Sequence, residues 1–288
     1  MMFDHVHAFY RPTTVPEALR LLRTLGAGSR VVAGATDLAV QAQRSTRYLI
    51  DITRLGLDYI HRRPKGWAIG ATTTMAALEL SPQIGKLADG ILAQAASTCG
   101  SVQLRNMATV GGNLANASPA ADTATPLLAL DASAVVQTPR GKRTLPLSSF
   151  FTGPHRTALQ GALLVEIRIP DPPRGSRWCF EKLGRTESDI AVVNLAAGLR
   201  FDRSGQCSFA RLALGAVAPT PMRALAAEAL LAGQKLTSRL LGRVAAQVMQ
   251  DVQPISDIRG SAEYRREMCG VLVKRALADC AERAGCAL

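Results

Sequence analysis

The sequence predicts an α+β protein of two domains, the first built from two small α/β lobes and the second from an antiparallel sheet followed by helices. Helical and β-branched segments alternate over the first part of the chain. A proline-rich break at residues 170–175, Pro-Asp-Pro-Pro-Arg-Gly, separates them from three strand patterns and a helical C-terminal part. A chain of 288 residues is long enough for two domains, which we place at 1–172 (lobes about 1–55 and 56–172) and 173–288.

The first lobe begins with a helix whose start is marked by a capping box. Thr14 can cap the helix, Pro16 suits its first turn, and Glu17 can return a hydrogen bond to the cap. Apolar residues at helical spacing continue the helix to about Leu25, where glycines end it. Strands are then expected at 31–33 and 48–52.

The second lobe contains short helical and strand patterns. Helices are expected at 75–80, capped by Thr73 or Thr74, and at 90–98, and strands at 67–71, 134–138 and 163–169. The apolar run 124–130 predicts a helix or a strand. Residues 151–155, Phe-Thr-Gly-Pro-His, indicate a loop near the site.

The C-terminal domain is predicted to be a three-stranded antiparallel sheet with a helical bundle. Its strands are expected at 178–183, 190–200 and 208–217, with a hairpin turn at 203–206. From Ala224 onward, apolar residues at spacings of three and four indicate helices at 226–232, 237–250 and 264–283.

Residues 30–38, Arg-Val-Val-Ala-Gly-Ala-Thr-Asp-Leu, join a short β-branched strand to a turn of small residues. Such a turn can cradle an anion with its backbone N–H groups. The segment lacks both the Gly-x-Gly-x-x-Gly spacing of a Rossmann turn and the Lys-Ser/Thr of a P-loop.

A second segment, residues 108–122, is almost entirely small or hydrogen-bonding: Ala-Thr-Val-Gly-Gly-Asn-Leu-Ala-Asn-Ala-Ser-Pro-Ala-Ala-Asp. Gly111 and Gly112 have no Cβ, so the backbone can adopt positive φ and let a ligand approach its N–H groups. Asn113, Ser118 and Asp122 add side-chain donors and acceptors. A polar loop on a rigid support predicts a binding site, and the alternative is a plain Gly-Gly turn with local hydrogen bonds.

Composition disfavours several classes of protein. The chain is 48% hydrophobic and 19% charged, yet no apolar run approaches the roughly 18–20 residues of a membrane span. The first eight residues lack a signal-peptide pattern, so we expect a cytoplasmic protein. The formal charge of +12 is spread along the chain, which disfavours nucleic acid and suits a diphosphate cofactor or acidic partners. The six cysteines form no Cys-x-x-Cys pair; we expect reduced thiols, although a disulfide stays open.

Together, the two segments resemble the loops of the FAD-binding medium subunit of the molybdenum hydroxylases, the family of xanthine dehydrogenase and aerobic carbon monoxide dehydrogenase. The family's loops read like Ala-Gly-Gly-Thr-Asp-Leu and Thr-Ile-Gly-Gly-Asn-Leu-x-x-x-x-Pro-x-x-Asp. The resemblance continues through Lys-Leu-Gly-Arg-x-x-x-Asp-Ile-Ala at 182–191, Ala-Pro-Thr-Pro-Met-Arg at 218–223 and Asp-Ile-Arg-Gly-Ser-x-x-Tyr-Arg-Arg at 257–266. It implies a PCMH-type FAD-binding domain followed by a domain of the CO dehydrogenase flavoprotein type. Within the family, the chain looks most like the separate flavin subunit of bacterial xanthine dehydrogenases.

The resemblance also implies which residues contact FAD. Positions that match the first loop, expected at the diphosphate and ribityl portion, are Val31, Ala33, Gly34, Ala35, Thr36, Asp37 and Leu38. Positions that match the second are Thr109, Gly111, Gly112, Asn113, Ser118 and Asp122, the last expected to accept from a hydroxyl. Val165 and Lys182 match further flavin-proximal positions, with a core valine and a surface lysine as the alternatives, and Arg105 and Asn106 would brace the second turn. Ala35 departs from the commoner second glycine of the first loop.

The activity implied is that of an oxidoreductase subunit that transfers electrons. The resemblance implies a dissociable FAD in this chain, and no catalytic residue or metal ligand is expected here. Its partners would be a large molybdenum-cofactor subunit and a small subunit with two 2Fe-2S clusters, with NAD or another acceptor receiving the electrons. Two alternatives stay open, a stand-alone FAD-dependent reductase or oxidase and an interaction module without a cofactor. The substrate of the complex is not encoded in this subunit.

Overall fold

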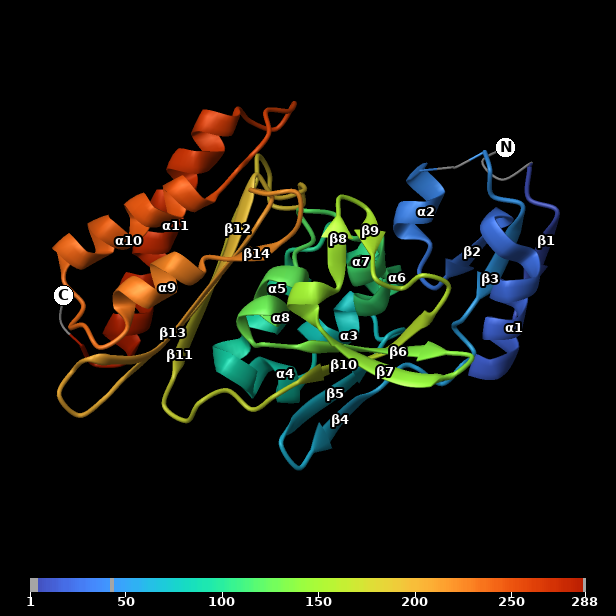
Figure 1. Cartoon of the computed structure of the whole chain (residues 1–288), viewed down its shortest axis with the longest axis horizontal. Helices are drawn as coiled ribbons and strands as arrows, with labels where there is room; N and C mark the ends of the chain where they lie inside the picture. Colours follow the sequence, from blue (N-terminus) through green and yellow to red (C-terminus); the bar gives the residue numbers. More distant parts are fainter. Residues whose placement is uncertain (1–4, 42–43, 287–288) are drawn as a thin grey trace.

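The computed structural model describes residues 5–41 and 44–286 of the chain. Figure 1 shows three main sheets following one another along the molecule, each accompanied by helices. Residues 1–4, on which part of the expectation about a signal peptide rests, lie outside the described part. Within that part, no helix has both the length and the apolar character needed to cross a membrane.

The first lobe is a parallel sheet with a capped helix against it. Strands β1 (Ala8–Tyr10), β3 (Tyr48–Asp51) and β2 (Ser29–Val32) pair in the order β1-β3-β2. The chain passes through α1 (Val15–Leu25), the 3-10 turn η1 (Gly26–Gly28) and α2 (Thr36–Gln41). The predicted cap of α1 by Thr14 is confirmed, because the N–H of Glu17 donates to Thr14 Oγ1 at 3.3 Å. The return bond differs from the expected capping box, because the Glu17 carboxylate accepts the N–H of Thr13, at 3.0 Å, and not that of Thr14.

The second lobe is an antiparallel sheet of five strands. Its order is β4 (Ile60–Arg63), β5 (Gly66–Gly70), β10 (Leu163–Ile169), β6 (Ser133–Thr138) and β7 (Gly141–Pro146). The helices between β5 and β6 are α3 (Met75–Glu79), α4 (Pro82–Lys86), η2 (Leu87–Gly90), α5 (Ile91–Ser97), α6 (Val102–Met107), α7 (Val110–Asn116) and α8 (Ala124–Ala129). After β7 come η3 (Leu147–Ser149), β8 (Phe151–Gly153) and β9 (Arg156–Thr157).

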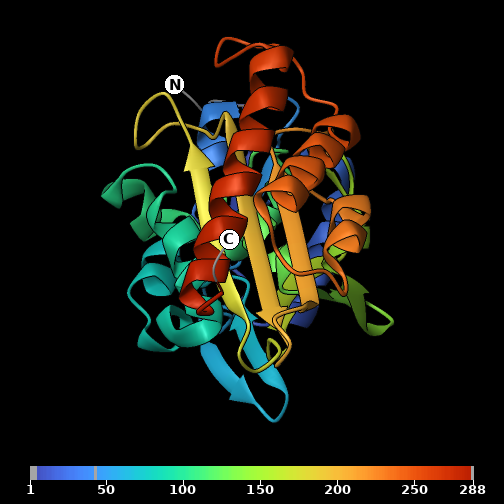
Figure 2. The same ribbon diagram turned by 90° about the vertical axis from the view of Figure 1, so that its left-hand side faces the viewer.

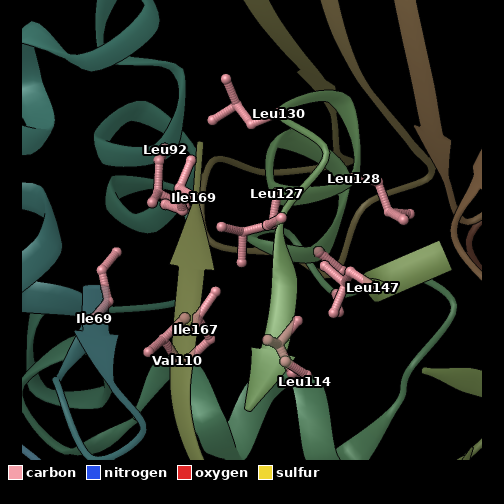
Figure 3. Close-up of a cluster of buried hydrophobic side chains, with 14 of the residues drawn as sticks. Ile69, Leu92, Val110, Leu114, Leu127, Leu128, Leu130, Leu147, Ile167 and Ile169 are labelled. Carbon is pink, nitrogen blue, oxygen red and sulfur yellow. The ribbon is translucent and has the colours of Figure 1, made fainter. Parts of the chain in front are cut away.

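The core of this lobe lies between the sheet and its helices. Figure 3 shows Ile69 of β5 and Ile167 of β10 together with Val110 and Leu114 of α7, all of which are fully buried. The opposite face of the sheet packs against the first lobe, where Val165 joins a cluster with Leu19 and other residues of α1. The sheet therefore holds α7 on one side and the first lobe on the other.

The C-terminal sheet lies between two helical layers. Its order is β11 (Arg177–Leu183), β12 (Val193–Phe201), β13 (Cys207–Gly215) and β14 (Met222–Arg223). Helices α9 (Leu225–Leu231), α10 (Ser238–Asp251) and α11 (Ala262–Arg283) cover its outer face, as Figure 2 shows. The inner face packs on α8 and α5 of the second lobe, which joins this sheet to the rest of the molecule.

The structure differs from the expected elements at several places, among them the turn of residues 30–38, whose last part is the start of helix α2. Two-residue β14 makes the C-terminal sheet four-stranded rather than three-stranded, and a pattern this short carries no sequence signal. Strand β12 begins at Val193 rather than at residue 190, and residues 151–155 belong to a small hairpin of β8 with β9 instead of a plain loop. About half of the segment 108–122, expected as a loop, is the helix α7.

A candidate cofactor site between the lobes

A cavity of about 540 Å³ opens where the first lobe meets the second. One wall is the end of β2 with α2, a second is α6 and α7 with the following residues 118–122, and a third is the turn 188–190 before β12. The volume falls within the range of roughly 300–1,000 Å³ that is usual for small-molecule and cofactor sites. The two predicted loops therefore face one common cavity.

The first wall is fixed by close backbone packing. A Cβ added to Gly34 would lie 1.8 Å from the carbonyl oxygen of Met107, so only glycine lets this turn approach α6. The next residue, Ala35, has φ of 58°, in the left-handed region. Helix α2 then begins at Thr36, and the N–H groups of Thr36, Asp37 and Leu38 find no acceptor among the described residues. The three residues line the cavity, so N–H groups that have no partner in the described part of the chain are available there for an anionic group.

Ala35→Gly is expected to raise the free energy of unfolding by up to about 1 kcal/mol. The left-handed conformation costs an alanine about 1–2 kcal/mol, and the greater freedom of glycine in the unfolded chain offsets part of the gain. Urea unfolding of the cofactor-free chain measures the effect. The control is Ala39→Gly inside α2, which should lower stability by about 0.5–1 kcal/mol. A loss of stability in Ala35→Gly would contradict the strain argument.

The second wall uses its N–H groups internally. Thr109 caps α7, its Oγ1 accepting the N–H of Gly112 at 3.1 Å, while the N–H of Gly111 donates to the carbonyl oxygen of Ala71 at 2.9 Å. Both glycines have ordinary helical φ values rather than positive ones. The expectation that the Gly-Gly pair exposes its N–H groups to a ligand is therefore wrong. The Thr109 cap satisfies the N–H of Gly112, and the Ala71 carbonyl oxygen satisfies that of Gly111.

The two glycines serve different purposes. A Cβ on Gly111 would lie 2.4 Å from the carbonyl oxygen of Ala71, so this glycine allows α7 to pack against the end of β5. A Cβ on Gly112 would meet only Thr109 Oγ1, at 2.9 Å, because Gly112 is exposed toward the cavity. Gly111 therefore supports packing, and Gly112 keeps the cavity open.

Side chains of α2 and α7 join the two walls. Gln41 Nε2 donates to Asn116 Oδ1 at 2.9 Å, and Nδ1 of His155 lies 3.0 Å from the carbonyl oxygen of Asn116. The N–H of His155 also donates to the carbonyl oxygen of Ala117 at 3.0 Å, which places the hairpin of residues 151–155 near the site as expected. Partial burial raises the pKa of Asp37, and His155 acts in the opposite direction.

Behind the cavity, a buried polar cluster joins the second lobe to the C-terminal sheet. Asp122 accepts from Lys182 Nζ at 2.8 Å and from Asn194 Nδ2 at 3.1 Å. Lys182 Nζ also donates to the carbonyl oxygen of Thr98 at 2.7 Å, and Thr125 Oγ1 donates to Asn194 Oδ1 at 2.7 Å. Burial raises the pKa of Asp122, although the Lys182 ammonium opposes this shift. Burial and the nearby Asp122 raise the pKa of Cys99, on the cavity wall, to about 11.

All but two of the predicted cofactor residues line the cavity. These residues are Val31, Ala33, Gly34, Ala35, Thr36, Asp37, Leu38, Thr109, Gly111, Gly112, Asn113, Ser118 and Asp122. Val165 is a core residue whose carbonyl oxygen accepts from Ala71, and Lys182 is neither in the wall nor at the surface but in the buried cluster. Arg105 pairs with Glu79 at 2.7 Å and donates to the carbonyl oxygen of Gly100 at 2.9 Å, so it ties α6 to α3 and to residue 100 rather than directly to the second turn.

Other wall residues were absent from the predicted set. Leu159 and the start of β10 supply apolar surface, and Ser188, Asp189 and Ile190 close the third wall. The motif at 182–191 contains the last two of these residues, so its similarity to the family pattern was a usable signal. Leu159 carries no such signal, because an apolar residue looks the same whether it faces a cavity or a core.

Comparison with known proteins decides the family. A family model described as the FAD binding domain in molybdopterin dehydrogenase matches residues 2–172, and one described as the CO dehydrogenase flavoprotein C-terminal domain matches residues 178–280. This chain belongs to the FAD-binding medium subunits of the molybdenum hydroxylases. The α+β fold of the PCMH type predicted from the sequence is thereby confirmed.

Relatives of this medium subunit match along nearly their whole length. The xanthine dehydrogenase FAD-binding subunit of Escherichia coli O157:H7 is 34% identical, with 99% of each chain covered. Subunit alpha of the 6-hydroxypseudooxynicotine dehydrogenase complex of Paenarthrobacter nicotinovorans is 34% identical, covering 98% of this chain and 95% of that one. A solved structure of carbon monoxide dehydrogenase from Hydrogenophaga pseudoflava, lacking the Mo-pyranopterin moiety of its cofactor, superposes with a TM-score of 0.93 at 35% identity, covering 98% and 99% of the two chains.

The residues of the cavity fit the FAD of this family. Free N–H groups at the start of α2 are donors of the kind that a diphosphate needs, and the start of β10 offers the apolar surface that a flavin or adenine ring needs. The exposed edge of Gly112 leaves room for a close approach. Chemistry and space therefore agree with the family assignment.

Proposed function

We propose that this medium subunit binds FAD in the cavity between its lobes and uses it to carry electrons from iron–sulfur clusters of a small partner subunit to NAD or another acceptor. A large partner subunit with the molybdenum cofactor would hydroxylate the substrate. The observation that carries the proposal is the cavity itself, which brings the two family loops together around free N–H donors. The relatives' names support the partners, since each describes a subunit of a larger dehydrogenase or of a dehydrogenase complex.

Each wall would have a distinct task in holding FAD. The N–H groups of Thr36, Asp37 and Leu38 would donate to the diphosphate oxygens, and the Gly112 edge would let the chain of the cofactor pass close to α7. Asp122 keeps its carboxylate oriented by Lys182 and Asn194, and would accept from a hydroxyl of the ligand. When bound, FAD supplies the redox chemistry. The protein orients it and leaves the mouth of the cavity open to an acceptor.

The relatives' names support a choice of substrate that is made outside this chain. Two of them share 34% identity with it, yet one is named for xanthine and the other for 6-hydroxypseudooxynicotine. Medium subunits of one fold therefore serve enzymes with chemically different substrates. We propose that the substrate is selected by the large partner subunit.

The isolated chain, reconstituted with FAD, is expected to transfer electrons from NADH to an artificial dye at most, without oxidising a purine or another hydroxylase substrate. The reason is that FAD would be its only redox group, so the hydroxylation step needs the partner subunits. Dye reduction and purine oxidation are measured on the same preparation, with molybdenum and iron quantified. Adding the two partner subunits should restore substrate oxidation and bleach the flavin absorbance.

Purine oxidation by the single chain, in a preparation free of molybdenum, would overturn this division of tasks. It would favour the alternative of a stand-alone FAD-dependent oxidase. A folded chain that takes up no FAD would instead favour the third alternative, an interaction module without a cofactor. The visible spectrum of the purified chain, before and after addition of FAD, separates that third case from the other two.

A further inference from the structure

Arg265 is a buried cation that belongs to neither the cavity wall nor the polar cluster behind it. It lies in the first turns of α11, whose N-terminus is capped by Ser261, and only 2% of the residue is exposed. A buried guanidinium is costly unless acceptors surround it. Its position at the ends of two strands therefore calls for an explanation.

The guanidinium joins three separate segments. Nη1 donates to the carbonyl oxygen of Val192 at 2.6 Å and to that of Ala216 at 3.3 Å. Nη2 donates to Asp257 Oδ1 at 2.6 Å, while Nε has no partner among the described residues. The planar fork of arginine suits such divergent acceptors, and a lysine ammonium could not reach all three in the same geometry.

Two of the three segments connect to walls of the cavity, one along the chain and one through a hydrogen bond. Val192 follows Ile190, a residue of the third wall, by two positions. The N–H of Ala216 donates at 2.7 Å to the carbonyl oxygen of Pro119, which stands between the wall residues Ser118 and Ala120. One side chain thus restrains the backbone behind both walls.

The third segment, which contains Asp257 and Ile258, is connected to the wall turn 188–190 by the exposed side chain of Arg185. Arg185 Nε pairs with Asp189 Oδ2 at 2.9 Å, and its Nη1 reaches the carbonyl oxygen of Ile258 at 3.5 Å. Ile258 follows Asp257, which Arg265 binds. Arg265 therefore restrains the turn 185–190 in two ways, through the carbonyl oxygen of Val192 on its C-terminal side and through the segment 257–258 that Arg185 contacts.

We infer that Arg265 is a positioning residue for the cofactor cavity, holding the wall segments 118–120 and 188–190 from within the C-terminal domain. FAD affinity and the environment of the flavin then depend on α11, although α11 does not line the cavity. The inference rests on the proposed binding of FAD between the lobes. It adds that the C-terminal domain completes the site rather than merely accompanying it.

The test compares Arg265→Met and Arg265→Lys with Arg266→Met, which removes a charge from the next position of α11. Arg265→Met should raise the Kd for FAD about tenfold, the size of one lost charge-assisted hydrogen bond. Its FAD-saturated form should show an altered visible circular dichroism spectrum, and Arg265→Lys should lie between it and the wild type. The Arg266→Met control should match the wild type in both measurements.

Amide hydrogen exchange of the cofactor-free chain gives a readout that does not require FAD. Exchange in segments 118–122 and 188–192 should accelerate in Arg265→Lys but not in Arg266→Met. If the wild type takes up no FAD, the proposed function fails while this exchange result still decides the role of Arg265. If Arg265→Met does not fold, Arg265→Lys and the surface variant Arg185→Gln decide it, and unchanged Kd, dichroism and exchange in both would overturn the inference.

Discussion

Gly112→Val is expected to weaken FAD binding by about a hundredfold while leaving the chain folded. The new side chain would enter the cavity, because a Cβ at this position meets nothing but Thr109 Oγ1. Overfilling a packed site costs up to about 3 kcal/mol, and every 1.4 kcal/mol is about tenfold in affinity. The Kd for FAD is measured by flavin fluorescence, with far-ultraviolet circular dichroism as the check on folding.

The control is Gly242→Val in α10, a helical glycine at which an added Cβ would meet nothing within 4 Å. It makes the same substitution far from the cavity and should leave FAD binding unchanged. A second comparison is Gly111→Ala, which forces a Cβ against the Ala71 carbonyl oxygen and should reduce folding stability itself. Normal flavin stoichiometry in a folded Gly112→Val chain would refute the placement of FAD beside α7.

The location of the first wall could be predicted because its signal is local. A β-branched strand followed by Gly34 and small residues indicates a tight turn, and the free N–H groups of α2 lie where that turn was expected. Ala35 carried one signal, because the family's loops commonly have a glycine at this position, but the left-handed φ of 58° is seen only in the structure. The strain at this position became visible only in the structure.

The second wall shows why a glycine pair is ambiguous. Gly111-Gly112 favours a loop by propensity, yet Thr109 caps a helix there and Ala71, about forty residues earlier, accepts the N–H of Gly111. That contact depends on tertiary structure, so local reasoning could not supply it. The predicted residues of this segment line the cavity, but the expected reason for the glycines was wrong.

The third wall was missed for a related reason. Ile190 reaches the cavity because β11 and β12 pair and the C-terminal sheet packs on α8. The sequence around residue 190 contains no pattern that predicts either contact. The same distance in sequence hid the role of Lys182, which looked like a flavin contact or a surface lysine. Its partners Asp122 and Thr98 come from the second lobe. Contacts between domains thus account for most of what sequence patterns could not provide.

Lys182→Met is expected to lower the free energy of unfolding by about 3–5 kcal/mol, the usual cost of removing one partner of a buried ion pair. The side chains of Lys182 and Asp122 are only 6% and 8% exposed, so the remaining carboxylate would have neither a counter-ion nor enough water. Urea unfolding of the cofactor-free chain measures the loss without any contribution from FAD. For comparison, Arg62→Met breaks the exposed pair with Asp171, whose side chains are 51% and 43% exposed, and should cost far less stability because water screens both charges.

Removing both charges tests whether the loss comes from the stranded carboxylate or from packing. The double variant Lys182→Met with Asp122→Asn leaves no buried charge, so it should recover a large part of the stability lost in the single variant. Burial already raises the pKa of Asp122 in the wild type, and without Lys182 the carboxyl should take up a proton more readily still. The deficit of Lys182→Met relative to the wild type should therefore shrink as the pH falls, because protonation removes the uncompensated charge. A deficit that is independent of pH and equal in the single and double variants would show that Lys182 acts by packing alone.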